Sequence, residues 1–90
     1  MEIVRIEMEP EGTKLEHIAK FFTIDGTGYT RSVMVKYVVD NPGSAYVEGG
    51  KEDAPLVAVP RDDPWYVKTR ADDTVYDNLL YLPGGPRHGK

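Results

Sequence analysis

Short runs of alternating apolar and polar residues, separated by proline, glycine and charged residues, make up most of this chain. In residues 2–8 the alternation places Val4, Ile6 and Met8 on one face, which predicts a half-buried strand. Stretches rich in β-branched and aromatic residues predict further short strands at 17–24, 45–48, 56–59 and 66–70. The segment Asp25-Gly26-Thr27-Gly28 contains two glycines able to adopt a positive φ, and it predicts a tight turn.

One segment has the periodicity of a helix. The residues with the i, i+3, i+4, i+7 spacing of one helix face are Met34, Tyr37, Val38 and Asn41. Thr30 or Ser32 can cap its N-terminus, and Pro42 disfavours helical geometry at the residue before it. We therefore expect a helix that ends at about Asp40. Three valines elsewhere in the segment lower its helical propensity, and they leave a strand as the alternative.

These elements predict an α+β fold in which four to six short, mainly antiparallel strands pack on one α-helix. Proline, glycine and charge occur only in short connections, so we expect a single compact domain over residues 1–83. Residues 84–90 are rich in glycine and charge, and we expect a disordered C-terminal tail whose removal hardly changes thermal stability.

Apolar, acidic and turn-forming residues alternate most closely in residues 66–83. The stretch predicts a strand, a turn at 71–74 and a short extended return. A helical turn should follow, beginning at Asp77 and stopped by Pro83. We expect the leucines to anchor this end in the core and the carboxylates to accept backbone N–H groups. The residues expected to hold the stretch together are Asp72, Asp77, Asn78, Leu79, Leu80 and Leu82.

The same stretch carries a resemblance. The motif Tyr66-Val67-Lys68-Thr69-x-Ala71-Asp72, followed by Asp77-Asn78-Leu79-Leu80-x-Leu82-Pro83, resembles the signature of DUF-3892, a small prokaryotic and phage family of unknown function. The likeness extends to Glu16-His17-Ile18 and Ala45-Tyr46-Val47, so it covers nearly the whole chain. Asp73 and Val75 stand where the family pattern has glycine and tryptophan. The resemblance implies a compact α+β domain in a phage-linked or defence-linked setting, and it implies no particular activity.

Composition narrows the classes of function. The formal net charge of −4 disfavours nucleic-acid binding, which depends on a cationic surface. The chain has no cysteine, which excludes disulfides and thiolate metal sites and suits a cytoplasmic protein. No apolar run approaches the roughly 18 residues that span a bilayer, so we expect no membrane association.

Aromatic residues are numerous and point to binding rather than catalysis. Those at the surface would offer rigid contact area with a polar tip, as protein interfaces favour. We therefore predict a non-enzymatic interaction module that binds a protein partner or a second copy of itself, without a cofactor. The residues predicted to form its binding surface are Trp65, Tyr66, Lys68, Arg70 and Asp72.

Two other functions stay open. A small enzyme or ligand-binding protein would use His17 as a general base with Asp72 or Asp77, although Glu16 is poorly placed to orient the imidazole. A nucleic-acid binder would use Trp65, Lys68 and Arg70. We expect no metal, because Asp72, Asp73 and Asp77 lack the spacing of a calcium loop.

Overall fold

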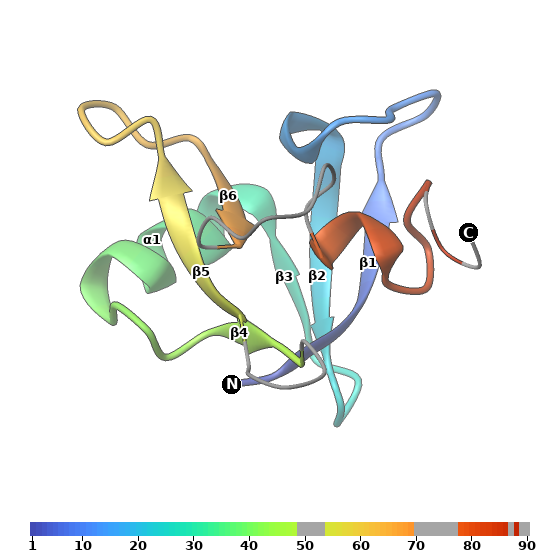
Figure 1. Ribbon diagram of the computed structural model, residues 1–90, viewed down its shortest axis with the longest axis horizontal. Helices are drawn as coiled ribbons and strands as arrows, with labels where there is room; N and C mark the ends of the chain where they lie inside the picture. The colour runs from blue at the N-terminus through green and yellow to red at the C-terminus, as the bar shows by residue number, and fades with distance from the viewer. Residues whose placement is uncertain (49–53, 70–77, 87, 89–90) are drawn as a thin grey trace.

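The computed structural model describes residues 1–48, 54–69, 78–86 and 88. They form two antiparallel three-stranded sheets and one α-helix, which confirms the α+β class (Figure 1). The elements are β1 (Ile3–Met8), the 3₁₀ helix η1 (Leu15–His17), β2 (Ile18–Thr23), β3 (Gly28–Thr30), α1 (Arg31–Asp40), β4 (Tyr46–Val47), β5 (Ala54–Val59), β6 (Tyr66–Thr69) and the 3₁₀ helix η2 (Asn78–Tyr81).

The first sheet has the order β1-β2-β3, and its first two strands do not alternate regularly. Between the pairs Ile3↔Thr23 and Arg5↔Phe22, β1 advances by two residues while β2 advances by one, so Val4 is the extra residue of a β-bulge. The bulge brings Ile3 and Ile6, three residues apart, to the same buried face. The prediction that Val4, Ile6 and Met8 share the core face was therefore wrong for Val4, which is only half-buried.

The second sheet has the order β4-β5-β6 and is linked to the first through the start of the chain. Glu2 forms a parallel bridge with Tyr46, whose N–H donates to the Met1 carbonyl at 3.0 Å. The two sheets lie on opposite sides of the view in Figure 1, and their buried residues belong to one hydrophobic cluster. One core therefore serves both sheets.

Helix α1 begins and ends where the sequence predicted. Thr30 is the N-cap, and its hydroxyl accepts from the Val33 N–H; Asn41 closes the C-terminus through its N–H to the Tyr37 carbonyl at 2.8 Å. Of the expected inner face, Met34 and Val38 are buried and Tyr37 is half-buried, while Asn41 is exposed. Val35 is also buried, so the inner face is turned toward it relative to the prediction.

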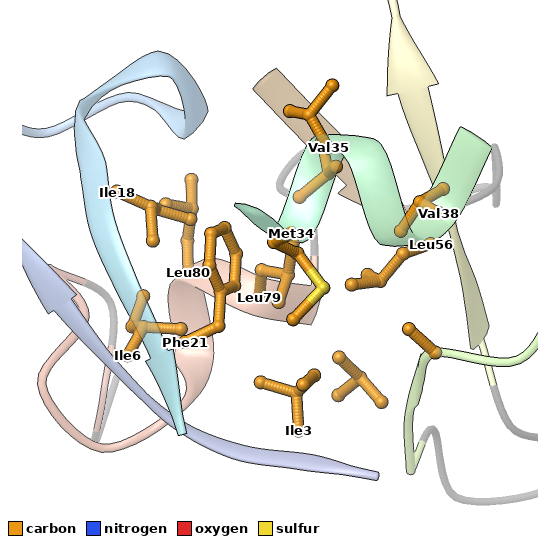
Figure 2. Packing of buried hydrophobic residues seen from close by; sticks show 13 residues of the cluster. Ile3, Ile6, Ile18, Phe21, Met34, Val35, Val38, Leu56, Leu79 and Leu80 are labelled. Atoms are coloured by element: carbon orange, nitrogen blue, oxygen red, sulfur yellow. The ribbon is translucent and has the colours of Figure 1, made fainter. Parts of the chain in front are cut away.

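The leucines of residues 79–82 enter the core as expected. Leu79 and Leu80 are buried and Leu82 is half-buried against the cluster. Figure 2 shows the Met34 side chain pointing toward the centre of the core, with Leu79 and Leu56 beside it. The turn of η2 therefore adds its two leucines to the core that the helix and both sheets share.

The expected boundary between domain and tail at residue 84 stays a prediction, but Gly84 and Gly85 take part in local structure. Gly84 adopts a φ of 88° against the backbone of Ile6, whose N–H donates to the Pro83 carbonyl at 3.0 Å. The Gly85 N–H donates to the Leu82 carbonyl at 2.9 Å. These contacts fix the chain beyond η2 against the outer side of β1.

Candidate functional site

Trp65 precedes β6 and is the most prominent aromatic side chain at the surface of the described residues. The residue is 49% exposed, and its backbone N–H donates to the Val59 carbonyl at 3.1 Å. The indole packs edge-on against Tyr66, with ring centroids 4.8 Å apart and planes at 65°. This T-shaped geometry is favourable for aromatic pairs, so the indole is held in place although half of it faces solvent.

Arg31, the first residue of α1, lies beside this tryptophan. Its guanidinium Cζ is 5.6 Å from the centroid of the indole, within the range of a cation–π contact. The same guanidinium donates to Glu9 Oε1 at 2.6 Å and to the Glu16 carbonyl. The helix start therefore ties Trp65 of the second sheet to two segments that flank the first sheet.

The helical pattern alone places Arg31 on the outer face of α1, but its side chain is only 31% exposed. Sequence reasoning missed this residue because its partners lie 15 and 22 residues away along the chain. Its charge is already paired with Glu9, so the guanidinium orients the indole rather than forming an open anion site. Such a cluster supplies a rigid, amphipathic contact area.

Strand β6 positions two other residues of the predicted binding surface. Val67 and Thr69 are buried, while Tyr66 and Lys68 are half-buried on the alternate positions of the strand. Lys68 pairs with Val57 of β5 across the sheet. The structure therefore brings Trp65, Tyr66 and Lys68 into one short segment. Arg70 and Asp72 lie outside the described residues, as do Asp73 and Asp77.

His17 ends η1 and has a structural role in the preceding loop. Its Nδ1 accepts the backbone N–H groups of Thr13 and Lys14, each at 3.2 Å. Gly12 lies so close that a Cβ there would be 2.5 Å from the His17 Cβ. The lone pair of Nδ1, which a general base would need, is therefore used to hold the loop. The acid partners proposed for it, Asp72 and Asp77, are not among the described residues.

A groove that the sequence did not predict runs between the C-terminal half of α1 and β5. Its volume is about 530 Å³, which lies within the range of roughly 300–1,000 Å³ that is typical of ligand sites. Its apolar walls include Val38, Val39, Leu56 and Val57, and Arg61 is its charged residue among those described. Val39 lies outside the buried helix face, but Val33 does too and does not line the groove, so the sequence does not mark the groove by itself.

In the part of the chain that the structure describes, no three His, Asp or Glu side chains lie close enough together to hold a metal ion. In the same residues no helix has the length and apolar character needed to cross a membrane.

Comparison with protein-family models, with curated proteins and with solved structures finds no match to this chain. The resemblance to DUF-3892 therefore stays a prediction.

Proposed function

We propose that this chain is a small protein-binding module whose contact surface is centred on Trp65. The observation that carries the proposal is the half-exposed indole held between the edge of Tyr66 and the guanidinium of Arg31. Tryptophan, tyrosine and arginine are the residue types enriched at the energetic centres of protein interfaces. A pre-oriented side chain also loses little conformational freedom on binding.

A protein partner fits this surface better than nucleic acid does. The chain has a net charge of −4, and the arginine nearest the indole is paired with Glu9. Stacking on single-stranded nucleic acid needs a cationic groove that follows the backbone. Lys68 is the described cation that the alternative would use, and it is half-buried. The cytoplasmic location and the phage-linked or defence-linked setting belong to this proposal as expectations.

The test is affinity capture of the full chain from cells that make it naturally, after nuclease treatment, with Trp65→Ala beside the unchanged protein. We expect one or more proteins to be retained by the unchanged chain and lost with Trp65→Ala. Ile24→Ala is the matched control, because Ile24 is 82% exposed and lies at the tip of the β2–β3 hairpin. Its removal should leave the captured protein unchanged.

Sedimentation of the purified chain tests self-association in parallel. A monomer–dimer equilibrium that Trp65→Ala shifts toward monomer would identify the partner as a second copy. Capture that survives Trp65→Ala, or that disappears on nuclease treatment, would contradict the proposal.

A further inference from the structure

The groove between α1 and β5 has a shape and lining suited to an apolar segment. Val38 and Val39 line it from the helix, and Leu56 and Val57 line it from the strand. Its volume of about 530 Å³ lies within the range of sites that bind small ligands and peptide side chains. Val39 remains 52% exposed, so apolar surface in the groove is accessible to a ligand.

The charge among the described residues that line the groove is positive. Arg61 lines it, and no described lining residue is acidic. Within the described part of the chain, Arg61 has no hydrogen-bond or ion-pair partner, whereas Arg31 is paired with Glu9. Asp62 and Asp63 follow Arg61 in the chain but are not among the lining residues. A carboxylate in the groove would therefore find an arginine fork with its donors available.

We infer that this groove binds the apolar C-terminal end of a partner polypeptide, with the terminal carboxylate on Arg61. One carboxylate matches Arg61, the one cation among the described lining residues, and the aliphatic side chains that precede it match the valine and leucine walls. This inference rests on the proposed function, because it names the part of the partner that docks beside the contact surface. Pro64 lines the groove and directly precedes Trp65, so the groove and the contact surface are joined through adjacent residues of the loop that leads into β6.

The test uses three synthetic peptides: acetyl-Gly-Ser-Ala-Val-Val with a free carboxylate, its C-terminal amide, and acetyl-Gly-Ser-Ala-Ser-Ser with a free carboxylate. Binding is followed by the amide NMR shifts of Val39, Val57 and Arg61. The first peptide should bind best, and the amide should bind about fivefold more weakly, as expected for a solvent-accessible charge pair. The serine peptide should bind least, because it lacks the apolar side chains.

Two pairs of variants assign the contacts. Arg61→Gln should abolish the difference between acid and amide, whereas Arg5→Gln, at an exposed arginine on β1, should preserve it. Val39→Ser should weaken both valine peptides, whereas Val33→Ser should not. Val33 and Val39 are equally suitable for replacement, being 51% and 52% exposed on the same helix, but only Val39 is among the groove-lining residues.

Equal binding of acid and amide to the unchanged protein would overturn the inference. So would equal effects of Val39→Ser and Val33→Ser, or no binding at millimolar peptide. These failures are distinct from failure of the proposed function, which is decided by Trp65→Ala in the capture experiment. If capture depends on Trp65 but the peptides do not bind, the contact surface stands and the groove is not part of it.

Discussion

The guanidinium of Arg31 lies over the indole of Trp65, with its Cζ 5.6 Å from the ring centroid. The two residues are far apart in sequence, and they belong to α1 and to the segment entering β6. Arg31 also pairs with Glu9 and donates to the Glu16 carbonyl. This one side chain therefore relates the proposed contact surface to the loop between β1 and β2.

Arg31→Gln should destabilise the fold and loosen Trp65. A partly exposed ion pair contributes under about 1 kcal/mol, and a cation–π contact about 0.5–1 kcal/mol. Their loss together with the carbonyl hydrogen bond should lower the free energy of unfolding by about 1–2 kcal/mol, or the melting temperature by roughly 5–10 °C. Thermal unfolding and the emission spectrum of the single tryptophan measure both effects.

Arg5→Gln is the control for this variant. Arg5 lies 3.8 Å over the Phe22 ring but is exposed, and no ion pair joins it to another described residue. Arg5→Gln should leave the emission of Trp65 unchanged, and it should lower the free energy of unfolding less than Arg31→Gln does. An emission spectrum that is the same in Arg31→Gln and the unchanged protein would contradict the orienting role of Arg31.

The role of His17 can be tested by exchanging its acceptor. His17→Leu removes the atom that accepts the N–H groups of Thr13 and Lys14, and should lower the free energy of unfolding by about 1–2 kcal/mol. His17→Asn places a carbonyl oxygen near the position of Nδ1 and should retain more of that stability. Denaturant unfolding of the two variants gives the comparison.

Partner capture should be the same for both His17 variants once they are folded. A loss of activity in folded His17→Asn, out of proportion to its stability, would instead favour the alternative in which His17 acts as a general base.

The sequence predicted those parts of the fold that depend on neighbouring residues. The helix cap at Thr30 and the turn at Gly26 are set by local backbone chemistry, and both are found where expected. The core face of β1 was not predictable in this way, because the bulge at Val4 follows from its register with β2. Strand β3 is only three residues long and is stabilised by pairing with β2, so no periodicity could mark it.

The candidate site shows the same division. The aromatic pair at 65–66 is visible in the sequence, and its edge-on packing follows from adjacency at the start of a strand. The contact of Arg31 with Trp65 and the groove form only when α1 packs across β5 and β6, because this packing brings together residues that are distant in the chain. The structural role expected for Asp72 and Asp77 stays a prediction, since both lie outside the described residues.

Asp25 gives the hairpin tip a dependence on pH. Hydrogen bonds from the Thr23 hydroxyl, and then from Thr27, lower the pKa of this carboxyl below its ordinary value of 3.8. Because the folded pKa is the lower one, its stabilisation is present above the ordinary value and is lost as the pH falls through the lowered value. Asp25→Asn should therefore be less stable than the unchanged protein at neutral pH, and the difference should disappear as the pH falls below that lowered pKa.

Urea unfolding of the two proteins across this range measures that difference. Asp63→Asn serves as the control for removing an exposed negative charge, because the Asp63 side chain makes no hydrogen bond to another described residue. A stability difference for Asp25→Asn that is independent of pH would show that the carboxylate charge has no part in holding the turn.

The last prediction compares three glycines with nearly the same backbone geometry. Gly26, Gly43 and Gly84 have φ values of 88°, 81° and 88°, in the left-handed region that favours glycine. A Cβ at Gly26 or Gly43 meets no atom within 4 Å, so alanine there introduces only backbone strain of about 1–2 kcal/mol. At Gly84 a Cβ would overlap the carbonyl of Ile6, which is backbone and cannot rotate away.

Gly84→Ala should therefore lower the free energy of unfolding by about 2–5 kcal/mol, because overlap is added to the same strain. Relief would require the chain after η2 to separate from β1, which breaks the hydrogen bond from the Ile6 N–H to the Pro83 carbonyl. Denaturant unfolding of the three alanine variants tests this, and hydrogen exchange at Ile6 reports the separation directly. If Gly84→Ala were no worse than Gly26→Ala and Gly43→Ala, residues after Pro83 would not be held against β1, and the expected tail would begin at Gly84.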